Sequence, residues 1–129
     1  MNHVSVQTGP FDLHAEMQRL CADNTAIGAV ASFVGLVRDC NRVAARSSGV
    51  AALPLEHDPG MTEKALQRIA ERARQRWQLQ GLVLIHRVGE LHPGEPIVLV
   101  MSAAQHRQDA FDACQYVMDI LKTEAPLWK

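Results

Sequence analysis

Apolar side chains recur at three- and four-residue steps in three segments of the chain, the spacing that places them on one face of an α-helix. The first segment follows Asp12, a residue type that caps helices, places Leu13, Met17 and Leu20 on one face, and fades near residues 23–24. The second begins at Asp58 and Pro59, a capping residue followed by proline in the first turn. The third covers about 108–124. We therefore expect three helices at these positions.

Four shorter apolar runs lie between these segments and predict β-strands. They cover residues 27–37, 50–56, 82–88 and 97–103. A turn that contains Pro93 and Gly94 separates the last two, so we expect them to form an antiparallel hairpin. The resulting order, αββαββα without strict alternation, favours an α+β sandwich with a mainly antiparallel sheet.

Small residues and breaks in the pattern add detail to this layout. Gly28, Ala29, Ala31 and Gly35 in the first predicted strand indicate close approach of another backbone or of a ligand near the end of that strand. Pro54 places the second strand at a sheet edge or at an irregularity, because proline lacks a donor for the ladder. Residues 39–49 have no apolar period and are predicted to form a surface loop.

Length and charge limit the class of protein. A chain of 129 residues has room for one domain, which we place at residues 1–129. With 13 basic and 14 acidic residues the formal net charge is −1, so the chain has no general attraction for nucleic acid or an anionic membrane. The apolar runs are too short to span a bilayer, and the amino terminus lacks a signal-peptide layout. A soluble, cytoplasmic protein is expected.

The cysteines and histidines follow no disulfide or metal pattern. The three cysteines are odd in number and share no CxxC spacing, and Cys114, on the apolar side of a helix, is most simply a core residue. The six histidines do not pair at metal-ligand spacing on one helix. We therefore predict no disulfide framework, no metal and no other cofactor.

A lysine interrupts the apolar stripe of the last predicted helix. Phe111, Cys114 or Gln115, and Met118 recur at helical spacing and should face the core, and Lys122 continues their line. One interpretation is that Lys122 complements the helix dipole in the last turn, before the stop signal of Pro126. The other is that its amine enters a pocket, where apolar neighbours and other cations allow it to exchange a proton near neutral pH.

Further cationic groups stand at the ends of predicted elements. Arg38 follows the first strand, and His106 and Arg107 precede the last helix, where free backbone amides favour an anion. Because arginine offers a bidentate fork, this pair is a candidate site for phosphate or an oxyanion. The alternative is that Arg107 forms a surface ion pair with Asp109 or another nearby acid.

Five ordered blocks span most of the chain, and together they resemble the catalytic, larger subunit of molybdopterin synthase. The blocks are Phe33-x-Gly35-x-Val37-Arg38, Leu55-Glu56-His57-x-Pro59-Gly60-Met61, Ile85-His86-Arg87-x-Gly89-Glu90-Leu91, His106-Arg107-x-x-Ala110-Phe111 and Lys122-x-x-x-Pro126-x-Trp128-Lys129. The resemblance implies an α+β hammerhead fold with an added antiparallel sheet, in a subunit that needs no metal. It departs from the family at the loop 39–49, which is longer than in many relatives, and at Asp58, where an aromatic residue is common.

The same resemblance implies an activity and an assembly. Members of this family form a central homodimer that carries two small ubiquitin-like sulfur carriers, a heterotetramer in all. The Gly-Gly tail of the carrier ends in a thiocarboxylate, and its sulfur goes twice to cyclic pyranopterin monophosphate to make the dithiolene of molybdopterin. The chain is therefore expected to be a sulfurtransferase of molybdenum cofactor biosynthesis.

Matching positions carry the family's site onto this chain. The resemblance implies that Lys122 lies beside the thiocarboxylate, with Lys129 close by. It implies that the pterin and phosphate of the substrate are held by Leu36, Val37, Arg38, His106 and Arg107, and that Phe33 and Met118 wall the pocket. In the family the His-Arg pair reaches the neighbouring subunit's pocket, so dimerisation would complete the site. Fixed cations suit this chemistry, because sulfur transfer produces a carboxylate and redistributes negative charge.

Two other functions remain open. Relatives continue past the position of Lys129 into a tail with further basic contacts, so the chain could be a non-catalytic partner that docks a ubiquitin-like protein without turnover. Alternatively, Arg38, His106 and Arg107 could form a generic binding module for phosphate ligands.

Overall fold

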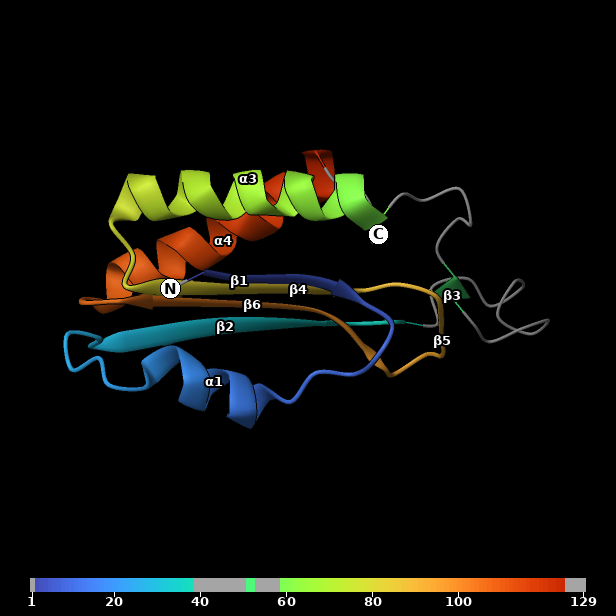
Figure 1. The fold of residues 1–129 in the computed structure, drawn as a ribbon, viewed down its shortest axis with the longest axis horizontal. Coiled ribbons are helices and arrows are strands. Elements are labelled where there is room, and N and C mark those ends of the chain that lie inside the picture. Colours follow the sequence, from blue (N-terminus) through green and yellow to red (C-terminus); the bar gives the residue numbers. More distant parts are fainter. Residues whose placement is uncertain (1, 39–50, 53–58, 125–129) are drawn as a thin grey trace.

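The computed structural model describes residues 2–38, 51–52 and 59–124. A four-stranded sheet has α3 (Pro59–Trp77) and α4 (Arg107–Glu124) on one face and α1 (Leu13–Cys21) on the other (Figure 1). The strands are β1 (Asn2–Gln7), β2 (Ala29–Leu36), β3 (Ala51–Ala52), β4 (Gly81–Arg87), β5 (Glu90–Leu91) and β6 (Pro96–Ala104). This arrangement confirms the predicted α+β sandwich.

The sheet has the strand order β1-β4-β6-β2. β4 pairs antiparallel with β6, as the predicted hairpin requires, and β2 pairs antiparallel with the other side of β6. β1 pairs parallel with β4 and was absent from the predicted order, which began with a helix. Its apolar signal is weak, because only Val4 and Val6 are apolar in its interior and both are only partly buried against the core.

A second, two-stranded sheet pairs β3 with β5 antiparallel. β3 is the only described part of the strand that we predicted at 50–56, and the predicted loop at 39–49 lies outside the described residues. β5 lies within the connection between β4 and β6, where Gly89 and Gly94 have φ values of 97° and 93°. Glycine suits both positions because other side chains are strained at positive φ.

Apolar side chains fill both faces of the sheet. The larger core cluster lies between the sheet and the α3–α4 pair and includes Leu66, Ile69 and Val117. A smaller cluster, with Leu20, Ile85 and Met101, lies on the face that α1 covers. β4 is buried along its whole length, as expected of a strand that is covered on both faces.

Two predicted helix faces are rotated relative to the structure. Asp12 caps α1 as predicted, its carboxylate accepting a hydrogen bond from the Ala15 amide at 3.1 Å. However, α1 turns Glu16 and Leu20 toward the sheet, which leaves Met17 46% exposed. On α4, the core side is formed by Ala110, Ala113, Val117 and Leu121, and the predicted core residues Cys114 and Met118 are also buried in this cluster. Phe111, predicted to face the core, is therefore 61% exposed.

A close backbone approach is found at Gly28, directly before β2 begins, and not near the end of the strand where we predicted it. Its amide donates a hydrogen bond to the Ala104 carbonyl at 2.9 Å, and a Cβ at this position would overlap the carbonyl oxygen of Gln105. This contact ties the start of β2 to the end of β6, directly before α4 begins. The position of α4 relative to β2 is thereby set.

Candidate functional site

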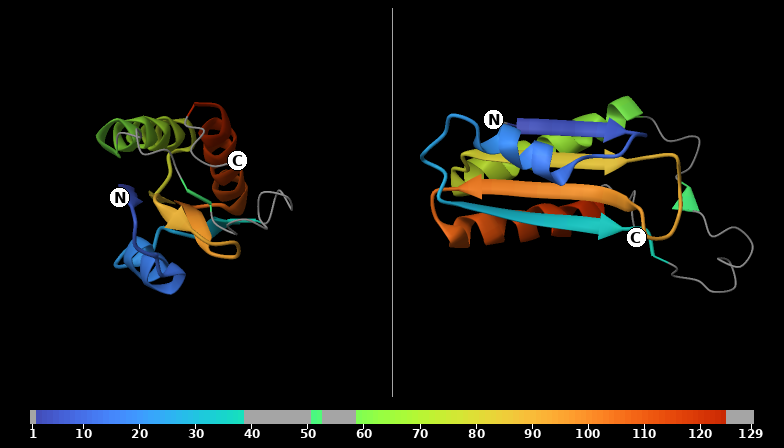
Figure 2. Two further views of the ribbon diagram at one scale, coloured as in Figure 1. Left: turned by 90° about the vertical axis from the view of Figure 1, so that its right-hand side faces the viewer. Right: turned by 90° about the horizontal axis from the view of Figure 1, so that it is seen from below.

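A pocket of about 420 Å³ opens between β2 and α4. α4 contributes one side of it and the edge strand β2 contributes the other, as expected from their position side by side (Figure 2). The lining residues are Ala31, Ser32, Phe33, Phe111, Cys114, Gln115, Met118, Asp119 and Lys122. The apolar stripe of α4 that ends in a lysine therefore faces this pocket, beside the core-facing side chains.

Lys122, Phe33 and Met118 come together in this pocket. Lys122 is exposed and stands in the last turn of α4, whereas Met118 is 8% exposed and Phe33 is half-buried against the core. The two interpretations of Lys122 are therefore compatible, because the lysine lies at the negative end of the helix dipole and also lines the pocket. A flexible amine beside apolar walls can bind a carboxylate group or exchange a proton with it.

Cys114 also lines the pocket, as a buried residue that is 8% exposed. Burial disfavours the thiolate and raises the pKa of Cys114 from its ordinary 9.0 to about 11. Because the thiolate is the reactive form of cysteine, Cys114 is a poor nucleophile at neutral pH.

Arg38 lies two residues past β2 and is exposed, as is Leu36, whereas Val37 is buried. Val37 is fixed by two backbone hydrogen bonds to the connection between β4 and β6. Its amide donates to the Glu95 carbonyl at 2.9 Å, and its carbonyl accepts from the Gly94 amide at 2.6 Å. The three predicted residues thus alternate between solvent and core, with Arg38 held directly after a fixed backbone position.

Arg38 and Lys122 stand toward the same end of the molecule. β2 begins beside the end of β6, since Ala29 pairs with Ala104, and α4 starts three residues after that point. α4 then runs alongside β2 in the direction of the strand (Figure 2). β2 and α4 therefore end on the same side of the molecule. Arg38 lies there just after β2, and Lys122 lies there in the last turn of α4.

His106 and Arg107 lie at the opposite end of α4. The 15 residues from Arg107 to Lys122 span about 22 Å along a helix. Within one chain, this pair is therefore far from Lys122, and neither residue is among those that line the pocket, although the lining residue Phe111 is only one helical turn from Arg107. Both residues are exposed, and in the described part of the chain Arg107 makes no ion pair with Asp109 or Asp112. The surface ion pair that we considered for Arg107 is thus not formed there.

Other predictions are partly outside the described residues. Lys129 is among them, so only its sequence position is known. Within residues 2–38, 51–52 and 59–124, no group of three His, Cys, Asp or Glu side chains could hold a metal ion. No described helix is long and apolar enough to cross a membrane. Asp119 was missed by sequence reasoning, although its position three residues before Lys122 places it on the same side of the helix.

Comparison with known proteins gives a consistent result. A family model described as "MoaE protein" matches residues 6–124. The molybdopterin synthase catalytic subunit of Ralstonia nicotianae is 54% identical over 129 residues, which is 100% of this chain and 71% of the relative. The subunit of the same name from Pseudomonas aeruginosa is 55% identical over 126 residues, which is 98% of this chain and 81% of the relative.

A solved structure agrees with these relatives. The molybdopterin biosynthesis MoaE protein from Burkholderia ambifaria superposes with a TM-score of 0.82 at 51% identity, covering 97% of this chain and 79% of that one. The likeness thus extends over nearly all of this chain. The chain belongs to the MoaE family, the catalytic subunits of molybdopterin synthase.

Proposed function

We propose that this chain transfers sulfur from the C-terminal thiocarboxylate of a small ubiquitin-like carrier to cyclic pyranopterin monophosphate, forming the dithiolene of molybdopterin. The observation that supports this most directly is the pocket between β2 and α4, with Lys122 among its lining residues. Membership of the MoaE family supports this reaction, and the pocket is a suitable place on the chain for it. The product belongs to molybdenum cofactor biosynthesis.

The pocket suits the tail of such a carrier. Phe33, Phe111 and Met118 offer apolar contact area, and a Gly-Gly tail is thin enough to lie against them. The transfer leaves a carboxylate on the carrier, and the Lys122 ammonium can stabilise that charge or supply a proton. In this proposal Lys122 is the catalytic residue, and Lys129 assists it from beyond the described residues.

The substrate requires a second set of cations. We assign the phosphate and pterin of the substrate to Arg38, with Leu36 and Val37 beside it. His106 and Arg107 serve the same purpose for a second copy of the chain, because about 22 Å of helix separates Arg107 from Lys122 of its own chain. The active assembly is then a homodimer with one carrier at each site, a heterotetramer that we place in the cytoplasm.

The test is direct turnover with purified components. Thiocarboxylated carrier and cyclic pyranopterin monophosphate should yield molybdopterin with the wild-type chain. Lys122→Ala should lower the rate by about 10²–10³-fold, because a positioned cation at the developing charge is lost. Lys64→Ala is the matched control, since Lys64 is an exposed lysine of α3. Normal turnover by Lys122→Ala would refute the role of Lys122.

The alternative functions give different results in the same assay. Carrier binding without product, with both substrates present, would favour a docking partner that lacks turnover. Binding of the phosphorylated pterin no tighter than inorganic phosphate would favour a generic phosphate module. The pocket beside Lys122 favours the sulfurtransferase over both, because neither alternative requires an amine at an apolar pocket.

A further inference from the structure

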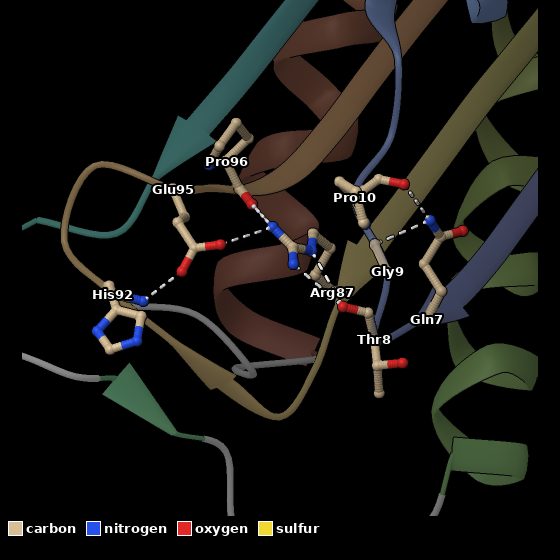
Figure 3. Close-up of polar contacts among 8 residues, drawn as sticks. All are labelled: Gln7, Thr8, Gly9, Pro10, Arg87, His92, Glu95 and Pro96. Carbon is tan, nitrogen blue, oxygen red and sulfur yellow. Dashed lines mark hydrogen bonds and ion pairs between the residues drawn. The ribbon is translucent and has the colours of Figure 1, made fainter.

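A buried arginine joins three segments of the chain at the end of the sheet where Arg38 emerges. Arg87, the last residue of β4, is 7% exposed. Its Nε and Nη2 donate hydrogen bonds to the Thr8 carbonyl at 3.4 and 3.1 Å, and its Nη1 donates to the Pro96 carbonyl at 3.1 Å (Figure 3). The guanidinium thereby ties the end of β4 to the segment after β1 and to the start of β6.

The same guanidinium holds the carboxylate of Glu95. Nη1 of Arg87 lies 3.4 Å from Oε1 of Glu95, and the other oxygen, Oε2, accepts a hydrogen bond from the His92 amide at 2.7 Å (Figure 3). The Glu95 amide in turn donates to the His92 carbonyl at 3.0 Å. The amide of His92, with a smaller effect from Arg87, holds the pKa of Glu95 below its usual 4.5. The carboxylate is thus ionised, and it closes the turn 92–95 on itself.

The turn 92–95 also holds in place the backbone directly before Arg38. The Glu95 carbonyl accepts a hydrogen bond from the Val37 amide, and the Gly94 amide donates a hydrogen bond to the Val37 carbonyl. Gly94 has a φ of 93°, so few other residues could present that amide without strain. The β2–β6 register shifts between Gly35 and Leu36, so regular strand pairing stops one residue before Val37. Among the described residues, the turn is what continues to hold the chain there.

We propose that Glu95, clamped by Arg87, is a positioning residue that fixes Arg38 for binding of the phosphorylated substrate. The inference rests on the proposed function, in which Arg38 contacts that substrate. The chain of contacts runs from the Arg87 guanidinium to the Glu95 carboxylate, through the turn 92–95, and then through two backbone hydrogen bonds to Val37. Glu95 itself touches no reacting atom in this scheme.

The ion pair between Arg87 and Glu95 is better suited to positioning the turn 92–95 than to stabilising the fold. The Glu95 side chain is 37% exposed, and partly exposed ion pairs contribute little to folding because water and salt screen them. Arg87 keeps its carbonyl acceptors at Thr8 and Pro96 when the carboxylate is removed. Glu95→Ala should therefore fold, with a looser turn and a less well placed Arg38.

A double-mutant cycle tests the inference on the assembled enzyme with carrier. Glu95→Ala should raise the KM for cyclic pyranopterin monophosphate on the order of tenfold and change kcat by less than about twofold. In an Arg38→Ala background the same change should add less than about twofold, because Glu95 acts through Arg38. Glu95→Gln, which keeps acceptor and donor atoms at the turn, should give an intermediate KM. Glu71→Gln removes an equivalent exposed carboxylate from α3 and should leave KM unchanged.

A second measurement does not depend on turnover. Amide hydrogen exchange of Val37 should accelerate in Glu95→Ala, whereas exchange of Val100 in the centre of β6 should not change. Unchanged Val37 exchange would overturn the inference, as would additive effects in the cycle or an unchanged KM in either single variant. Absence of product with the wild-type chain would instead refute the proposed function, so the two failures are distinguishable.

Discussion

The separation of Lys122 from His106 and Arg107 gives the most demanding prediction. If one active site takes Lys122 from one chain and Arg107 from its partner, two inactive variants should restore activity when mixed. The variants are Lys122→Ala and Arg107→Ala, each carried by a separate chain. The 15-residue separation along α4, about 22 Å, places the two groups at opposite ends of the helix, so we expect the Lys122 and the Arg107 that act on one substrate molecule to come from different chains.

The expected recovery follows from the symmetry of a homodimer. Random exchange of two variants gives mixed dimers as about half of the population, and each mixed dimer holds one intact site and one site that lacks both groups. Activity should therefore return to about a quarter of the wild-type value. Each variant alone should retain about 10⁻²–10⁻³ of wild-type activity, because each lacks one cation at the developing charge.

The assay is molybdopterin formation after the two variants are unfolded together and refolded, or exchanged at low protein concentration. Mixing Lys122→Ala with a Lys122→Ala, Arg107→Ala double variant is the matched control, because no mixed dimer of that pair has an intact site. Recovery no greater than the sum of the separate variants would refute the reasoning. In that case the site would be complete within one chain, or His106 and Arg107 would have no part in it.

Three further predictions concern stability and reactivity. Ser102→Ala should lower the free energy of unfolding by about 1 kcal/mol in urea titrations, because the fully buried hydroxyl donates to the Ala110 carbonyl at 2.5 Å; an unchanged midpoint would contradict this. The pKa of Cys114, raised to about 11, predicts alkylation by iodoacetamide at pH 8 about a hundredfold slower than for an ordinary thiol; rapid native-state labelling would show that Cys114 is accessible as thiolate. Because the pKa of Glu95 is lowered from 4.5, its stabilising contribution is present above pH 4.5 and is lost as the pH falls through the folded-state pKa. Because the pair is partly exposed this contribution is small, so Glu95→Gln should weaken the acid dependence of stability below pH 4.5 only slightly, and a stronger acid dependence in the variant would contradict the contact.

Much of the fold follows from local patterns in the sequence. The helices α3 and α4 and the β4–β6 hairpin have long apolar periods with clear start and stop residues, and the structure confirms them. The strand β1 carries a weaker signal, because its burial depends on pairing with β4 about 80 residues away. Leu13 and Met17 show the same limit, since the turn of α1 that faces the sheet is decided by packing.

Some residues of the candidate site could likewise be predicted from the sequence, and others could not. Phe33 and Lys122 were predicted from the family blocks and Met118 from its helical spacing to Lys122, and the structure places all three in one pocket. Asp119 and Ser32 could be identified as pocket residues only from the structure, because helical or strand spacing alone does not show that β2 and α4 lie side by side. The contacts of Arg87 were also beyond the sequence, since they join segments near residues 8, 87 and 95 that no local pattern connects. The catalytic and binding roles of all these residues remain predictions.

The central claim is that the thiocarboxylate tail of the carrier reaches Lys122 in the pocket between β2 and α4. A structure of the chain with the carrier bound tests this most directly. We expect the terminal glycine of the tail in that pocket, with its terminal group within hydrogen-bond reach of Lys122 Nζ, about 2.7–3.2 Å. A tail that ends elsewhere on the chain, with the pocket beside Lys122 left open, would contradict the account.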